Sequence, residues 1–337
     1  MVYHDIHIPL PAFIAIDFTG MTLALIPIIL RFYLRWRERA NGPQPLSRNL
    51  SDGLIALSWL SGLVLISINA WKNSLRQRYI SWPASELYYS VPLPLSAHLL
   101  YVSWVSLFFI YIALWAAKFA LIAFFASVMA LMETKLARVF VGLATAYASA
   151  TFILHIVLLT RWCDPISSNW ATDGHLCSAV HDIRSVTIST VANITTDLVI
   201  LSLPIFALAT LSRERRLLTM ETARVTKAEW SGFALVVAVA ALSISAALAR
   251  WITLNAVRNV PKANITHTID VWALVEIVAS LLAVCLPSLR SFVRRSRSER
   301  SRRTGNNSQG QSLPSSLHWT KGSEITVRTG STGSKGF

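Results

Sequence analysis

Seven long runs of apolar residues alternate with shorter polar segments along the chain. A helix of about 20 residues is long enough to cross the hydrocarbon core of a bilayer. The third run is long for one crossing and short for two, and it lacks Gly and Pro, so it predicts one long, tilted helix. The pattern predicts an all-α membrane protein, a seven-transmembrane helix bundle. The runs cover residues 12–34, 52–71, 99–132, 137–160, 186–211, 230–255 and 268–289.

Composition supports the membrane interpretation. Hydrophobic residues make up 53% of the 337 residues and charged residues only 14%, whereas soluble domains average about 25% charged residues. The net charge is +14, but the basic residues lie in short loops and in the C-terminal tail beside apolar runs. That arrangement is typical of membrane proteins and argues against nucleic acid as a partner.

The distribution of Lys and Arg predicts the orientation. The loops after the first, third and fifth runs, together with the tail, hold 22 of the 31 basic residues, and the opposite side holds seven. Basic residues concentrate on the cytoplasmic side, so we expect the N-terminus outside and the C-terminus in the cytosol. The expected parts are an outside N-terminus (1–11), a seven-helix membrane domain (12–293) and a disordered, basic, Gly/Ser-rich cytosolic tail (294–337). We expect a multi-pass protein of the plasma membrane rather than of internal membranes.

Five charged residues lie inside the apolar runs: Asp17, Lys118, Asp197, Arg250 and Glu276. A charge at that depth is costly unless it is paired or hydrated. We therefore expect the three acids and the two bases to pair with one another.

Polar and aromatic neighbours extend this set. Helical spacing places Asn193 one turn from Asp197, and Trp272 one turn from Glu276, and His155 lies in the outer part of the fourth run. We expect a polar pocket with aromatic walls, open to the outside, for a small amphipathic molecule. The alternative is a buried ion-pair network that only fixes helix packing. The candidate pocket residues are Asp17, Lys118, His155, Asn193, Asp197, Arg250, Trp272 and Glu276.

Two cysteines, Cys163 and Cys177, fall in one predicted outside loop. Outside loops are oxidising, so we expect a disulfide there, with a structural rather than a redox role. The sequon at Asn264 lies in another predicted outside loop and is a candidate glycosylation site. We expect no metal site, and the sequence contains no P-loop, HExxH, CxxC or Gly-x-Ser-x-Gly motif.

Several of these residues also occur in a known family. Over residues 14–293 the chain resembles the fungal rhodopsin-domain integral membrane proteins, a group that includes a satratoxin-cluster membrane protein and surface-sensing, receptor-like proteins. One departure is that Ser51 stands where the family usually has the first of two aspartates. The resemblance rests on Lys118 in KFALIAFFASV, on Cys163, Pro165, Trp170 and Cys177, on Asp197 and Pro204, on Arg250, and on Trp272, Glu276, Cys285 and Pro287.

The resemblance implies a receptor-like protein, possible association with a secondary-metabolite (toxin) gene cluster, and a cytosolic signalling partner. It does not imply retinal. Microbial rhodopsins hold retinal on a lysine of helix seven, and the seventh run here contains no lysine, so we expect no cofactor.

Three functions remain open. The first is a non-enzymatic receptor for a small extracellular molecule. The second is an intramembrane enzyme of the terpene-cyclase type, with Glu276 or Asp197 as the acid. The third is a transporter for a small metabolite, although the sequence shows no clear internal repeat of the kind on which many transporters are built.

Overall fold

The computed structural model describes residues 10–39, 46–130, 134–172, 177, 182–218, 227–257 and 270–286. The chain divides into two compact units, Met1–Phe292 and Val293–Phe337, and every described residue belongs to the first. The predicted cytosolic tail, the glycosylation candidate Asn264 and most of the predicted N-terminal segment lie outside the described residues.

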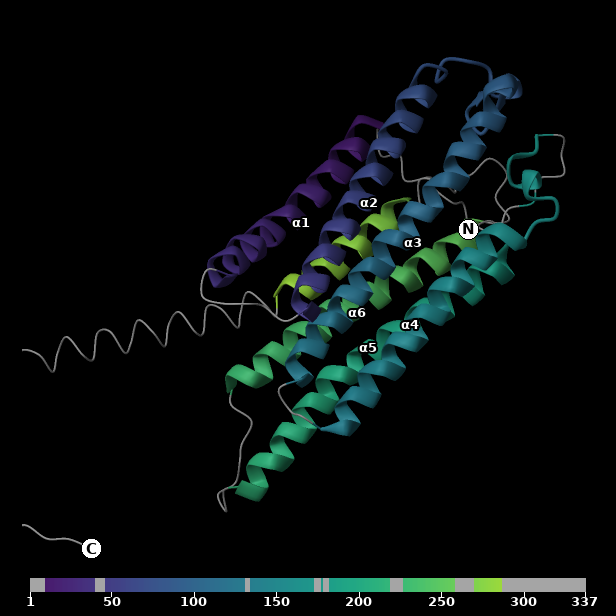
Figure 1. The fold of residues 1–337 in the computed structure, drawn as a ribbon. Coiled ribbons are helices and arrows are strands. Elements are labelled where there is room, and N and C mark those ends of the chain that lie inside the picture. Colours follow the sequence, from purple (N-terminus) through teal and green to yellow (C-terminus); the bar gives the residue numbers. More distant parts are fainter. Residues whose placement is uncertain are drawn as a thin grey trace, which may run out of the picture. The chain divides into compact units, whose positions relative to one another are not determined.

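Seven long helices make up most of the described residues, one at the place of each predicted apolar run (Figure 1). The all-helical prediction is therefore confirmed. Five helices are long and apolar enough to cross a membrane, and α6 and the helix 270–286 are the remaining two. The helices are α1 (Leu10–Arg39), α2 (Leu46–Gln77), α3 (Leu93–Met129), α4 (Lys135–Arg161), α5 (Ile183–Leu218), α6 (Lys227–Val257) and the helix over 270–286.

Helix α2 extends beyond its predicted run at both ends, and this corrects one prediction. Lys72 and Arg76 are two of the seven basic residues that the charge distribution places in loops on the outer side, yet both lie inside α2 and are 1% and 5% exposed. Lys72 remains buried because Asp270 of another helix pairs with it at 3.1 Å. The apolar run ends just before Lys72, but the helix continues beyond it. The pattern of apolar residues therefore could not show that Lys72 and Arg76 are helical and buried.

A short ribbon joins α2 to α3. After the 3₁₀ turn Ala84–Glu86, the strands β1 (Leu87–Tyr88) and β2 (Val91–Pro92) pair antiparallel. Both residues between them, Tyr89 and Ser90, have positive φ angles of 55° and 65°, as a type I′ hairpin turn requires. Helix α3 follows immediately, with a proline in its first turn, where the missing N–H costs nothing.

The helices pack mainly as sequence neighbours, with α3 in the middle. Helix α2 packs on α1 and α3, and α3 also contacts α4 and α5. The larger apolar core joins α1, α2, α3 and the helix 270–286, with Met21 and Ile277 among its buried residues. Gly62 keeps this core tight, because a Cβ there would lie 2.7 Å from Cε of Met21. A second core joins α3, α4 and α5.

A covalent link closes the loop after α4. Cys163 and Cys177 form the expected disulfide, with a Cα–Cα distance of 5.8 Å, so that prediction is confirmed. The 3₁₀ helix η3 (Ile166–Trp170) lies within the closed loop. Its Trp170 packs against Tyr101 and Trp104 of α3, with ring centroids 5.1 and 5.5 Å apart. We call this end of the bundle the disulfide end.

Candidate functional site

The helix 270–286 presents polar groups at three levels, and each level meets a cation from another helix. Asp270 pairs with Lys72, Glu276 faces Arg250, and the carbonyl of Val284 accepts a hydrogen bond from Arg31. A rise of 1.5 Å per residue separates these levels by about 9 and about 12 Å along the helix axis. The buried charges therefore form three clusters rather than one.

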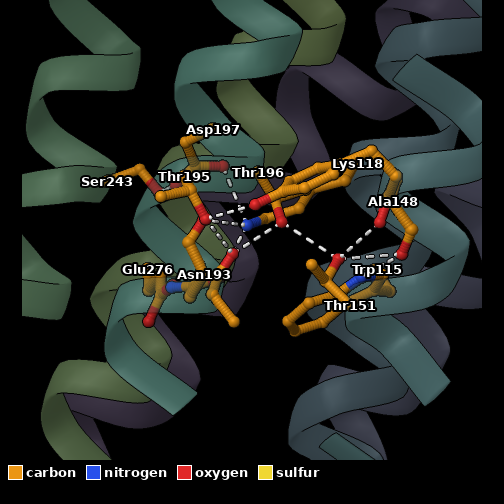
Figure 2. Close-up of polar contacts among 12 residues, drawn as sticks. Trp115, Lys118, Ala148, Thr151, Asn193, Thr195, Thr196, Asp197, Ser243 and Glu276 are labelled. Carbon is orange, nitrogen blue, oxygen red and sulfur yellow. Dashed lines mark hydrogen bonds and ion pairs between the residues drawn. The ribbon is translucent and has the colours of Figure 1, made fainter. Parts of the chain in front are cut away.

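The middle level is the most connected, and we call it the central cluster (Figure 2). Lys118 of α3 points toward α5, where its Nζ lies 2.9 Å from Oδ1 of Asp197. The same ammonium group donates to the side-chain oxygen of Asn193 at 2.5 Å and to its backbone carbonyl at 3.1 Å. Three acceptors on one face of α5 thus satisfy the three N–H groups of one buried lysine.

Asn193 connects this pair to the helix 270–286. Its Nδ2 donates to Oε1 of Glu276, which is fully buried. The other carboxylate oxygen of Glu276 lies 3.6 Å from Nη1 of Arg250 in α6, an ionic contact without a hydrogen bond. On the same helix, Ser243 donates a long hydrogen bond of 3.4 Å to Asp197. The structure thus pairs four of the five charges that the sequence predicts to pair.

Aromatic side chains flank the cluster on α3. The Trp115 ring lies 4.9 Å from Nζ of Lys118, a favourable cation–π contact, and its indole N–H donates to the carbonyl of Ala148 in α4. His155 is buried beside this ring, 4.3 Å away, and contacts the carbonyls of Thr151 and Ser189. His155 therefore joins α4 to α5 beside the cluster rather than binding any of its charges.

Two other candidate residues lie apart from the hydrogen-bonded cluster. Trp272 is partly buried one turn from Glu276, and it makes no ring contact or hydrogen bond to any described residue. Asp17 belongs to the level at the disulfide end, where it interacts electrostatically with Asp270 and Lys72. Both carboxylate oxygens of Asp17 are buried and meet no hydrogen-bond criterion with the described residues. The side chain of Asn69 lies nearby.

The third level, at the opposite end from the disulfide, was not predicted from the sequence. Arg31 of α1 donates to Asp52 at 3.0 Å, to Ser51 at 2.8 Å and to the carbonyl of Val284 at 2.7 Å. Ser51 in turn donates to the carbonyl of Ala120, so four helices meet at one guanidinium group. The available signal was Arg31 itself, because it lies inside the first apolar run. The orientation argument groups it with the basic residues of the loop after that run.

Two small cavities, each of about 30 Å³, flank the central cluster. One lies toward the disulfide end and is lined by Tyr111, Ser189, Thr190 and Arg250 among others. The other is lined by Lys118, Asp197 and residues of α6 and the helix 270–286. Binding pockets for small molecules usually measure about 300–1,000 Å³. Each cavity thus has room for one functional group or one water molecule.

The family model of the fungal rhodopsin domain matches residues 30–295, which include all but Asp17 of the candidate site residues. Comparisons with curated proteins and with solved structures found no match. The match to the family model covers well over half of the 337 residues. The chain is therefore a membrane protein that belongs to the fungal rhodopsin domain family.

Proposed function

We propose that this protein is a seven-helix, receptor-like membrane protein that binds a small extracellular molecule at the central cluster. The observation that supports this proposal best is the pair of buried ion pairs, Lys118–Asp197 and Arg250–Glu276, linking α3, α5, α6 and the helix 270–286. Buried charges inside a membrane bundle usually mark functional sites. In the expected orientation the disulfide end lies outside, and we propose that the ligand approaches the cluster from that end.

Helix α6 is the element that ligand binding is expected to shift. Its polar contacts to the cluster are long, at 3.6 Å from Arg250 to Glu276 and 3.4 Å from Ser243 to Asp197. The contacts between α3 and α5 are short, with Lys118 held at 2.5 to 3.1 Å from its three acceptors. A ligand that engages Arg250 would loosen α6 while α3 and α5 stay together, and this gives a two-state element on which ligand affinity can act. The change would reach a cytosolic signalling partner.

The two other functions fit the site less well. A cyclase needs a carboxyl group that can reach its substrate, whereas the carboxyl groups of Asp197 and Glu276 face Lys118 and Arg250 as partners. A transporter built on repeats should show internal symmetry, and the sequence shows none by inspection. We propose neither an enzymatic activity nor a retinal cofactor.

The experiment that tests the proposal is metabolite profiling of a deletion strain, with cells and medium analysed separately, alongside gene expression. The strain is complemented with wild type, with Glu276→Gln, or with Glu86→Gln as the control. Glu86 has the same charge as Glu276 and is exposed, in the 3₁₀ turn before β1. We expect deletion and Glu276→Gln to abolish a transcriptional or surface response while leaving the set of intermediates unchanged, and Glu86→Gln to restore the response.

Two results would contradict the receptor proposal. An intermediate that accumulates in the deletion strain, and persists with Glu276→Gln, would indicate an enzyme. A finished product trapped inside the cells would indicate a transporter. A normal response with Glu276→Gln at wild-type protein levels would show that the central cluster is not where the ligand acts.

A further inference from the structure

We propose that the cavity beside Arg250 recognises a neutral oxygen acceptor, such as a carbonyl group, at one end of a largely apolar small molecule. This inference rests on the proposed receptor function and specifies the class of its ligand. We call this cavity the Arg250 cavity; its polar lining residues are Tyr111, Ser185, Ser189, Thr190 and Arg250.

Unused hydrogen-bond donors are the first line of evidence. Arg250 is only 6% exposed, and its one polar side-chain contact to the described residues is Glu276 at 3.6 Å, too long for a hydrogen bond. A guanidinium group carries five N–H donors, and a donor that lacks an acceptor away from bulk water is unfavourable. A ligand oxygen, or a water in its absence, would supply the missing acceptor.

A second unpaired group lies in the same cavity wall. The hydroxyl group of Thr190 in α5 is buried and has no hydrogen-bond partner among the described residues, and Thr190 is 4% exposed. The neighbouring Ser189 is already engaged, because its hydroxyl lies 3.2 Å from that of Tyr111. Thr190 and Arg250 thus lie on two helices, α5 and α6, at one small cavity, and both have side-chain donors without a hydrogen-bond acceptor among the described residues.

The charge balance favours a neutral group over an ion. The central cluster holds two cations and two anions, and each cation has an anion as its partner. A carboxylate entering the Arg250 cavity would lie near Glu276 and compete with it for Arg250. A carbonyl oxygen accepts the same N–H donors without adding a second buried negative charge.

The remaining walls suit an apolar body. Leucine, isoleucine and valine side chains from α3, α4, α5 and α6 form the rest of the lining. The cavity of about 30 Å³ accommodates a single end group, so the hydrocarbon part must extend between these helices. Near its disulfide end lie Trp104, which donates to the carbonyl of the lining residue Leu159, and Trp170, which the disulfide loop holds against Trp104.

The test uses the purified full chain in detergent micelles and three probes of equal chain length. Undecan-2-one carries a carbonyl group, undecanoate a carboxylate, and undecane no oxygen. Each is added at the same ratio to detergent while thermal unfolding is followed. We expect undecan-2-one to raise the Tm by at least about 2 °C, and the other two probes to raise it by less than half as much.

Variants connect this shift to the cavity. Thr190→Val keeps the shape of the side chain and removes a hydroxyl that has no partner among the described residues, so its Tm without probe should match wild type. Arg250→Lys keeps the charge beside Glu276 but loses the planar set of donors. We expect either change to remove at least half of the shift with undecan-2-one. Thr195→Val, the same substitution on α5 at a residue that does not line the cavity, should retain it.

Four results would overturn the inference: a full shift in Thr190→Val, an equal shift with undecane, a larger shift with undecanoate, or no shift with any probe. None of these results decides the proposed function. If Thr190→Val restores the cellular response of the deletion strain and Glu276→Gln does not, the receptor stands and only the ligand class is wrong. If Glu276→Gln restores it as well, the central cluster is not where the ligand acts, and the proposed function fails at its site.

Discussion

At the scale of single residues, Lys118 shows how a buried charge becomes tolerable in this bundle. Its ammonium group has a carboxylate, an amide oxygen and a backbone carbonyl within 3.1 Å, and an indole ring on a further side. With every N–H donor occupied, the desolvation cost of the lysine is largely offset. If the lysine is removed, the remaining buried partner should therefore carry an uncompensated desolvation cost.

A double-mutant cycle tests this expectation. Lys118→Met keeps the length of the side chain and removes the charge. Among the described residues, Asp197 then retains only the long hydrogen bond from Ser243. We expect the free energy of unfolding to fall by roughly 3–5 kcal/mol, measured by thermal unfolding in detergent. The double change Lys118→Met with Asp197→Leu should recover most of this loss, because no unpaired charge remains. A double variant less stable than Lys118→Met alone would contradict this account.

At the scale of elements, the helix 270–286 acts as the axis to which the other helices are tied. It contributes Asp270, Glu276 and the carbonyl of Val284 to three different cations. The cations come from α2, α6 and α1, so packing of this helix is specified at three depths. The stability of an ion pair buried at one of these depths should depend on the presence of both charges. It should depend less on which of the two helices carries the positive charge and which the negative.

Exchanging the partners at the disulfide end tests that view. Lys72→Asp alone and Asp270→Lys alone each place two like charges at a contact that is now 3.1 Å long, and each should lower the free energy of unfolding by roughly 3–5 kcal/mol. The exchanged pair, Lys72→Asp with Asp270→Lys, should regain at least half of the Tm lost. If the exchange is no better than the worse single variant, the fixed surroundings of Lys72, including Asp17, determine stability at this level.

The elements also show what sequence reasoning could and could not find. The apolar runs located all seven described helices, because a bilayer-length helix needs continuous apolar residues. They also led to the charges at residues 118, 197, 250 and 276, which stand out against that background and are paired in the structure. The burial and pairing of Lys72, Arg31 and Asp52 were not predicted, because these residues lie near the ends of apolar runs. At a run end, the sequence pattern does not distinguish a charged side chain that points into the core from one that points into water.

Partner choice could not be predicted either. Asp17 was grouped with the central charges because it also lies in an apolar run, but it belongs to the level of Asp270 and Lys72. Depth along a helix follows from residue number, whereas the face of the bundle depends on how the helices pack. A single run of apolar residues does not contain the packing arrangement of the helices. That arrangement is known only from a structure that includes all of them.

At the scale of the whole molecule, two independent features agree on orientation. Disulfides persist in oxidising compartments, so the disulfide Cys163–Cys177 favours an outside position for this end. Arg35 and Arg37 lie at the other end of the bundle, near the C-terminus of α1, and basic residues concentrate on the cytoplasmic side. Both features favour the expected outside N-terminus, and seven crossings would then place the C-terminus in the cytosol.

Glycosylation mapping checks this orientation directly. We expect a sequon tag at the N-terminus to acquire a glycan, since it would enter the lumen during synthesis, and the same tag at the C-terminus to remain unmodified. The native sequon at Asn264 serves as an internal marker, because Asn264→Gln should remove one glycan if the loop before the helix 270–286 faces outside. Surface labelling of intact cells then distinguishes the plasma membrane from internal membranes. A glycan on the C-terminal tag would indicate a reversed orientation or a different number of crossings. If the N-terminal tag also lacked a glycan, the orientation would be reversed, and the Arg250 cavity would open toward the cytosol, out of reach of an extracellular ligand.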